Sequence, residues 1–374
     1  MQIIDYVFSH ISDARLEQLA HKFPVDKKNT KIMGSLIVKG LVILILSGQK
    51  VSLRMLSLLI DAHLGIEVTY SGLSKRLKKL NVDYFKALYE ELAQSCMQEM
   101  IPSDKQTLYR FDSTIITLCN KIIHGSVNVG GPNKDGYIKV TVGLKNEIPA
   151  SLRFCTNKSE SSEGIALVKA INEAKVTKED VLLFDRGIQK SHAYKEFTQQ
   201  GYQFVTRLNT VRRYKKISFN SIVISRDDGN TYTDDLIVHL YGNGPDTLIN
   251  NNVRVIHFLN ADQNPITLAT NIFHLSTQEI ADLYKRRWDI EIFFKFIKQN
   301  LGFKHFLSHN LNGMKVYIYM ILITALLFLL YKHKTKQTGY KLVLLSFKLR
   351  VEKSFIKDLI VLAGGNPDLV KDHL

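Results

Sequence analysis

Cysteine is scarce in this sequence. Cys96, Cys119 and Cys155 are the cysteines among the 374 residues, and they lie far apart without a Cys-x-x-Cys pair. A disulfide-rich domain or a zinc ribbon needs closely spaced cysteines, so neither class is expected, and a reducing cytoplasm fits. The first residues, MQIIDYVFSHISDARLEQ, also lack a basic stretch followed by an apolar core. We therefore expect no secretory leader.

Acidic residues are in the minority among the charged residues. The sequence has 50 Lys and Arg against 35 Asp and Glu, which leaves a net charge of +15. A folded protein with this excess is expected to meet a polyanion, either nucleic acid or an anionic membrane surface. A basic protein without such a partner is the alternative. The hydrophobic fraction of 45% and the charged fraction of 23% are typical of globular domains, which argues against a disordered or collagen-like chain.

Long hydrophobic runs are nearly absent. The one candidate, VYIYMILITALLFLLY, spans residues 316–331. This run is shorter than the roughly 20 apolar residues that a membrane-spanning helix needs. A helix that is hydrophobic on all sides can equally lie at the centre of a large core. We expect the buried helix, and the membrane protein is the alternative.

The character of the sequence changes along the chain. The first hundred residues have helical spacing, and after Pro102 short strands alternate with helices, which predicts a mixed α/β domain. Residues 210–265 are rich in short strands and polar turns. A long helix is expected after Ser276, because Ser276 with Glu279 three residues later forms a capping box.

A basic segment in residues 51–80 resembles a helix, a turn and a second helix. The second helix carries the cations Lys75, Arg76, Lys78 and Lys79, and Ser71 and Ser74 near its start are candidate caps. A helix-turn-helix would present such a helix to DNA. An ordinary solvated face of a helical bundle explains the same charges equally well.

Three acidic residues stand where charge is unusual. Asp112 interrupts the strand-like YRFDSTIITL, Asp185 follows the apolar VLLF, and Glu291 lies in the middle of the long helix among aromatic and aliphatic residues. Ligand-binding groups of α/β sheets gather at the carboxyl ends of strands. Each residue also has a simpler explanation. Asp112 could be a charge on an edge strand, Asp185 a turn residue, and Glu291 half of a surface ion pair.

Four polar residues share one face of that helix. At about 100° per residue, an arc of about 60° contains Tyr284, Arg287, Glu291 and Lys298. Lys285, Arg286 and Asp289 form a separate polar face. A surface helix needs only one polar face, so the first set is expected to line something other than bulk solvent.

The segment YKRRWDIEIFFKFIK resembles the Y-x2-R-x3-E-x6-K signature of bacterial insertion-sequence transposases of the DDE class. RFDSTII, LLFDRG and FVTRL resemble the segments around the two aspartates of that family and the strand that follows, and GYIKV with Lys139 resembles its second strand. The chain departs from the family at Thr141, where a histidine is frequent. The resemblance covers roughly residues 105–332.

The resemblance implies an RNase H-like catalytic core with a β-rich insertion. The implied organisation has a helical DNA-binding domain at residues 1–100, a core in two parts at 101–209 and 266–332, the insertion at 210–265 and a basic helical tail at 333–374. It also implies that Asp112, Asp185 and Glu291 are catalytic and bind Mg²⁺, with Mn²⁺ as a substitute. Two such ions about 4 Å apart can activate a water or a 3′-hydroxyl and stabilise the leaving oxygen.

The same resemblance implies the partners and the function. Tyr284, Arg287 and Lys298 would contact double-stranded DNA, the protein would act as a homodimer at synapsis, and it would work in the bacterial cytoplasm on the nucleoid. We predict a cut-and-paste transposase that binds terminal inverted repeats and catalyses strand cleavage and strand transfer. A metal-dependent endonuclease without strand transfer and a catalytically inactive DNA-binding derivative are the alternatives.

Overall fold

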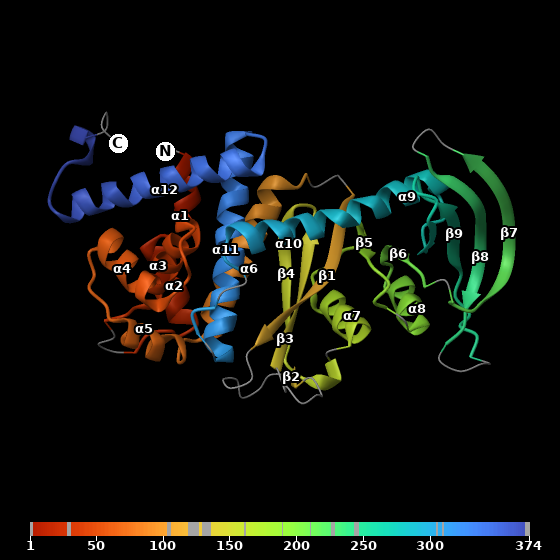
Figure 1. The fold of residues 1–374 in the computed structure, drawn as a ribbon, viewed down its shortest axis with the longest axis horizontal. Coiled ribbons are helices and arrows are strands. Elements are labelled where there is room, and N and C mark those ends of the chain that lie inside the picture. Colours follow the sequence, from red (N-terminus) through yellow and green to blue (C-terminus); the bar gives the residue numbers. More distant parts are fainter. Residues whose placement is uncertain are drawn as a thin grey trace. The chain divides into compact units, whose positions relative to one another are not determined.

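The chain divides into two compact units. A helical unit includes Met1–Met100 and Phe294–Leu374, and a core unit includes Ile101–Thr117 and Val127–Phe293. The computed structural model describes residues 3–27, 31–102, 106–118, 127–128, 136–160, 162–188, 190–209, 211–225, 229–242, 247–303, 306–308 and 310–370. Figure 1 labels the elements of both units. The division into five domains that is expected from the sequence stays a prediction.

The helical unit is built around one apolar helix, α11. It contains α1 Ile3–Ser9, α2 Asp13–Lys22, α3 Gly34–Ser47, α4 Leu53–Leu64, α5 Tyr70–Leu77, α6 Val82–Met100, α11 Leu311–Thr335, α12 Tyr340–Leu362 and the 3-10 helix η3 Pro367–Val370. α11 packs against α1, α3 and α6. By length and composition α11 could cross a membrane, but 94% of its most apolar stretch is buried inside the structure. The expected buried core helix is confirmed.

The basic segment of residues 51–80 forms two helices, α4 and α5, as predicted. The cap of α5 is Thr69, whose hydroxyl accepts from the Gly72 backbone N–H at 3.2 Å, so the expected caps Ser71 and Ser74 are wrong. Both serines lie inside the helix because Thr69 is the last residue with extended backbone. Ser71 is in its first turn.

One of the four cations in and directly after α5 is part of the fold. The Arg76 guanidinium pairs with Asp26 and donates to the Val25 and Ile32 carbonyls at 2.7 and 2.9 Å. A cation with these partners is held in place and contributes little to a free basic surface. The exposed cations of α5 and the turn after it are Lys75, Lys78 and Lys79.

The core unit is one large mixed sheet with helices on both faces. Its strands are β1 Thr107–Leu118, β2 Val127–Asn128, β3 Gly136–Lys145, β4 Ile148–Cys155, β5 Asp180–Phe184, β6 Gln203–Arg207, β7 Tyr214–Ser225, β8 Thr231–Leu240, β9 Val253–Leu259 and β10 Pro265–Thr270. The order is β2–β3–β1–β5–β6–β10–β9–β8–β7, with β4 paired to β3. The β-rich segment expected at 210–265 therefore continues the core sheet through β10, and its strands are long.

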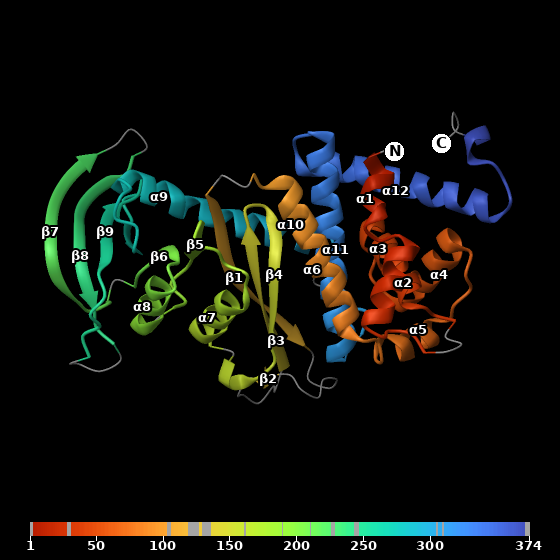
Figure 2. The same cartoon turned by 180° about the vertical axis from the view of Figure 1, so that it is seen from behind.

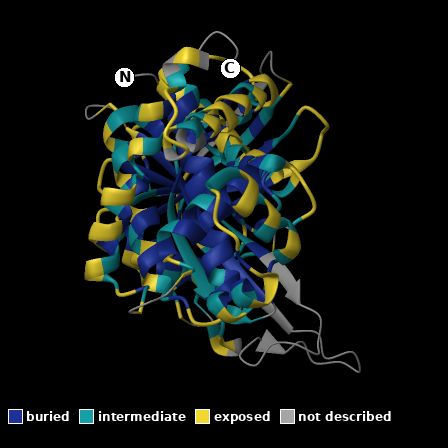
Figure 3. Ribbon diagram, turned by 90° about the vertical axis from the view of Figure 1, so that its left-hand side faces the viewer, coloured by how far each residue is buried: buried dark blue, intermediate teal, exposed yellow. Residues whose placement is uncertain are grey.

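The helices of the core unit pack on the two faces of the sheet. These helices are α7 Glu163–Glu173, α8 Ser191–Gln199 and α9 Thr277–Lys285, with the short η1 Lys158–Glu160 before α7. One cluster of buried residues joins α7 and α8 to Phe111 and Phe184, and a second joins α9 to Leu108 and Leu183. α7 and α8 thus cover one face and α9 the other (Figure 2). Buried residues lie along the strands and inner helices, while exposed ones follow outer turns and loops (Figure 3).

The expected RNase H-like arrangement is confirmed by this topology. Apart from the two-residue β2, β1 is the first strand and β5 the fourth. Asp112 lies on β1, Asp185 follows β5 directly, and Glu291 lies on the later helix α10 Asp289–Asn300. β5 is buried at all five positions, its charged first residue Asp180 is paired with Lys145 at 2.9 Å, and Asp185 is the first residue after the strand.

Arg110 on β1 fixes the start of α10. Its side chain is 1% exposed. The guanidinium donates to the Arg286 carbonyl at 2.6 Å, to the Asn146 carbonyl at 2.8 Å and to Asp289 Oδ2 at 2.7 Å. Burial lowers the pKa of Arg110 to about 10, and Asp289 acts in the opposite direction. The residue is therefore charged at neutral pH and holds β1 and α10 together.

We expect Arg110→Met to destabilise the core unit by about 3 kcal/mol, because Asp289 and two carbonyls lose a buried donor. Urea unfolding followed by circular dichroism measures this. The control is Arg207→Met on β6, which β5 separates from β1, and the Arg207 guanidinium makes a hydrogen bond of 3.5 Å to the Pro265 carbonyl. That variant should stay within about 0.5 kcal/mol of the wild type. Equal free energies of unfolding for the two variants would contradict the role given to Arg110.

Candidate active site

Asp112 and Asp185 start from neighbouring positions of the sheet. β1 and β5 are parallel, and Phe111 pairs with Phe184, so the next two positions along the strands are the two aspartates. Adjacent strands lie about 4.8 Å apart. Because side chains alternate between faces and the two phenylalanines point to the α7 and α8 side, both aspartates point to the α9 side.

Tyr284 on α9 reaches the second aspartate. Its hydroxyl donates to Asp185 Oδ1 at 3.2 Å. Burial raises the pKa of Tyr284 to about 12, and the charge of Asp185 acts in the same direction. The phenol is therefore neutral and a permanent donor at physiological pH, which holds the Asp185 carboxylate as an acceptor.

The long helix expected after Ser276 is interrupted. The capping box of Ser276 and Glu279 is confirmed, but α9 ends at Lys285, a 3-10 turn η2 spans Arg286–Trp288, and α10 begins at Asp289. Glu291 thus lies in the first turn of α10, and the expectation of a mid-helix position was wrong. The tighter turn forms where Arg110 binds the Arg286 carbonyl and the Asp289 side chain.

Arg287, in that turn, is the cation among the acidic residues. It donates to Glu291 Oε1 at 2.7 Å, and its Cζ lies 5.7 Å from the centroid of the Tyr284 ring. Burial by itself lowers the pKa of Arg287, but Tyr284, Glu291 and Asp185 outweigh it, and the pKa is raised. The side chain is 13% exposed. Within the described residues its Nε atom is buried without a hydrogen-bond partner.

The surroundings of Asp112 change the pKa of its carboxyl group. Burial raises the pKa of Asp112 to about 6. The Ser113 backbone N–H and Arg287 lower it, whereas the charges of Glu291 and Glu163 raise it further. Two other carboxylates are therefore close enough to repel a charge on Asp112.

Five of the predicted site residues gather in one place. Contacts or electrostatic interactions link Asp112, Asp185, Tyr284, Arg287 and Glu291. Lys298 lies further along α10, in the part counted with the helical unit, and its ammonium is 5.4 Å from the Phe294 ring centroid. The catalytic, metal-binding and DNA-binding roles of these six residues stay predictions.

Two further residues of the resemblance lie on β3. Lys139 is 6% exposed. The Thr141 hydroxyl lies 2.8 Å from that of Ser113, the residue after Asp112. Thr141 thus makes a local hydrogen bond where the family often has a histidine.

The donor chemistry of the cluster suits a divalent cation. Asp112, Asp185 and Glu291 offer carboxylate oxygens, which Mg²⁺ prefers, and one guanidinium balances three negative charges incompletely. Across the described part of the chain, no three His, Cys, Asp or Glu side chains are close enough to hold one metal ion together. Glu291 is instead bound to Arg287. The residues fit the ion by type and charge, and a ligand set would require this ion pair to open.

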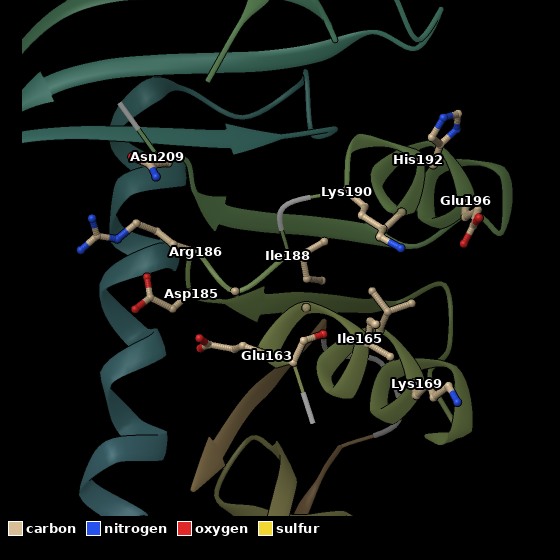
Figure 4. Close-up of a pocket in the computed structure, with 15 residues that line it drawn as sticks. Glu163, Ile165, Lys169, Asp185, Arg186, Ile188, Lys190, His192, Glu196 and Asn209 are labelled. Atoms are coloured by element: carbon tan, nitrogen blue, oxygen red, sulfur yellow. The ribbon is translucent and has the colours of Figure 1, made fainter. Parts of the chain in front are cut away.

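A cavity of about 860 Å³ opens beside Asp185 (Figure 4). Its lining includes Glu163, Arg186, Lys190 and Glu196. Glu163 was missed by the sequence analysis, because a glutamate that opens an amphipathic helix has an ordinary explanation. Arg110 was missed as well. The sequence feature that could have identified Arg110 is a second charge on the same apolar strand, two residues before Asp112.

Known proteins resemble this chain over most of its length. It is 26% identical over 287 residues to the "Probable transposase for insertion sequence element IS5377" of Geobacillus stearothermophilus, covering 75% of this chain and 72% of the relative. It is 22% identical over 268 residues to the "Putative transposase for insertion sequence element IS4SA" of Synechocystis sp., covering 70% and 72%. A shorter match of 32% identity over 141 residues links it to the "Putative transposase y4zB" of Sinorhizobium fredii, covering 38% and 39%.

The family model described as "Transposase DDE domain" matches residues 105–327, which is more than half of the chain. The matched range contains Asp112, Asp185 and Glu291, and thus the whole acidic cluster. The chain therefore belongs to the family of proteins with a transposase DDE domain.

Proposed function

We propose that this protein is an insertion-sequence transposase that binds the terminal inverted repeats of its element, cuts DNA and joins the cut ends to a target. The observation that carries the proposal is the gathering of Asp112 on β1, Asp185 at the end of β5 and Glu291 on α10 around Arg287, inside the matched DDE domain. Double-stranded DNA is the substrate that the family implies, and the net charge of +15 suits it.

Asp112, Asp185 and Glu291 are the residues we propose to hold Mg²⁺, or Mn²⁺ in its place. Bound there, the metal would lower the pKa of a coordinated water or 3′-hydroxyl and neutralise charge on the leaving oxygen. Tyr284 keeps the Asp185 carboxylate oriented as an acceptor. Arg110 keeps β1 and the first turn of α10 in register, so that Asp112 and Glu291 stay on neighbouring elements.

Arg287 has two successive partners in this proposal. In the free protein it is the counterion of Glu291. On DNA it donates to a phosphate, for which a guanidinium offers a bidentate fork. Tyr284 and Lys298 are the further DNA contacts, and the synaptic complex is a homodimer. The ion pair also supports the simpler explanation, in which Arg287 serves Glu291 alone, and the salt dependence of binding separates the two.

The experiment that tests the function uses duplexes made from the DNA that flanks the coding sequence. Incubation with the protein, Mg²⁺ and a target plasmid should give cut ends and then joined products. Cut ends without joined products, even from pre-cut duplexes, would support the endonuclease alternative. Binding without cutting would support the inactive derivative.

Replacing a carboxylate should separate chemistry from binding. We expect Asp185→Asn and Glu291→Gln to reduce strand cleavage by roughly a thousandfold, as when a preorganised electrostatic group is removed, while affinity for end DNA stays near that of the wild type. Single-turnover cleavage and gel-shift titration measure the two quantities. Glu173→Gln on α7 is the control, because Glu173 is held by Arg153 at 2.9 Å away from the cluster. Similar cleavage rates in all three variants would reject the proposed catalytic residues.

Removing a phosphate contact should change the salt dependence of binding. For Arg287→Ala and Lys298→Ala we expect weaker end binding and a slope of log K against log salt that is smaller by about one unit per contact. More enzyme or lower salt should partly restore cleavage in these variants, but not in Glu291→Gln. If the salt slope is unchanged and the thermal stability of Arg287→Ala falls, Arg287 is only the partner of Glu291.

The exposed lysines of α5 test the predicted helix-turn-helix. Because α11 forms the centre of the helical unit, the full chain is the proper sample, and a fragment of residues 1–100 would lack that centre. We expect the combined change of Lys75, Lys78 and Lys79 to alanine to reduce the preference for flanking DNA over random duplex about tenfold, since sequence-specific contacts are lost. An equal loss on both duplexes would leave α5 as a general basic surface.

A further inference from the structure

Glu163 lies near the end of β5, on the side of the sheet's strand ends where Asp185 follows the strand. It is the first residue of α7, and the chain runs from the end of α7 into β5 through a short connection. The helix and the strand therefore run in opposite directions, so the first turn of α7 lies near the end of β5. Glu163 also lies four residues before the buried Leu167, so it extends the sheet-facing side of the helix beyond the sheet.

A glycine allows Glu163 to lie against the turn after β5. A Cβ atom at Gly187 would be 2.8 Å from Glu163 Cγ and 3.2 Å from its Oε1, so any larger residue would displace the Glu163 side chain from this position. The Gly187 backbone N–H donates to the Asp185 carbonyl at 2.7 Å. In Figure 4 the Glu163 carboxylate points toward that of Asp185.

Glu163 also differs from its acidic neighbours in its partners. Glu160 and Glu173, on either side in the sequence, bind the Arg153 guanidinium at 2.6 and 2.9 Å. Within the described residues Glu163 has no hydrogen bond or ion pair. It instead lines the same cavity as Asp185. A carboxylate placed beside two others without a cation is electrostatically unfavourable, and a bound cation removes that cost.

We propose that Glu163 is a fourth carboxylate of the active site and binds the divalent cation together with Asp112 and Asp185. This inference rests on the proposed function of the site. A purely structural role is the alternative, because an acidic residue in the first turn of a helix is stabilised by the helix dipole. That role affects folding and leaves metal affinity unchanged.

The experiment measures Mn²⁺ binding to the full-length protein without DNA, by titration followed with electron paramagnetic resonance. We expect Glu163→Gln to weaken Mn²⁺ affinity about tenfold or more. Glu196→Gln is the matched control, since Glu196 lines the same cavity on α8, on the far side from Asp185 in Figure 4. Its affinity should equal that of the wild type. Asp185→Asn is the reference for a direct ligand and should weaken binding at least as much.

Gly187→Ala gives a second, charge-neutral test. The φ angle of Gly187 is outside the left-handed region, so alanine fits the backbone, and the added Cβ must displace the flexible Glu163 side chain. We expect weaker Mn²⁺ binding although every charge is kept. Thermal unfolding without metal shows whether each variant is folded. If Glu163→Gln does not fold, Gly187→Ala decides.

The outcomes separate this inference from the proposed function. If Asp185→Asn weakens Mn²⁺ binding while Glu163→Gln behaves like Glu196→Gln, the role of Glu163 is overturned and the proposed metal site stands. If Asp185→Asn binds Mn²⁺ like the wild type, the proposed function itself fails. A Glu163→Gln variant with lower thermal stability and unchanged Mn²⁺ affinity assigns Glu163 to the helix dipole, which also overturns the inference.

Discussion

Repulsion between the carboxylates that project from the middle of β1 and from the end of β5 is the constraint that organises the core unit. The register of the two strands makes Asp112 and Asp185 neighbours, and α10 adds Glu291. Negative charges that lie near one another are unfavourable unless a cation compensates them. Burial raises the pKa of Asp112, the charges of Glu291 and Glu163 add to this effect, and Arg287 interacts with the acidic groups as their counterion.

Two arginines meet this constraint in different ways. Arg110 is buried and fully engaged, with two backbone carbonyls and Asp289 as partners, so it fixes the position of α10 permanently. Arg287 has one ion pair and a buried Nε without a partner among the described residues, so the hydrogen-bonding groups of its guanidinium are not all satisfied. A guanidinium with free donors can change partners when a metal ion or a phosphate arrives. The two arginines thus separate the rigid part of the site from the part that responds to substrate.

The sequence allowed prediction of those parts that depend on local pattern. Asp112 and Asp185 were found because a charge on a buried strand, or directly after one, is unusual, and the sheet confirms both positions. The capping box of Ser276 follows from spacing alone. The family resemblance, which rests on motif spacing, was likewise sufficient for the RNase H-like arrangement.

The parts that failed depend on contacts between distant segments. The break between α9 and α10 occurs where a residue of β1, Arg110, binds the Arg286 carbonyl, and helical periodicity does not include such a contact. Arg76 was taken for a surface cation because its partner Asp26 lies 50 positions earlier. Glu163 has no distinguishing spacing, and only the turn at Gly187 reveals its place.

The most direct test of the central claim, that this acidic cluster is a divalent metal site, is a crystal structure of the full chain soaked with Mn²⁺ and recorded at the manganese absorption edge. The account predicts an anomalous peak bounded by Asp112, Asp185 and Glu291, with Arg287 displaced from Glu291. The absence of anomalous density there at saturating Mn²⁺, with the Arg287–Glu291 pair intact, would contradict it.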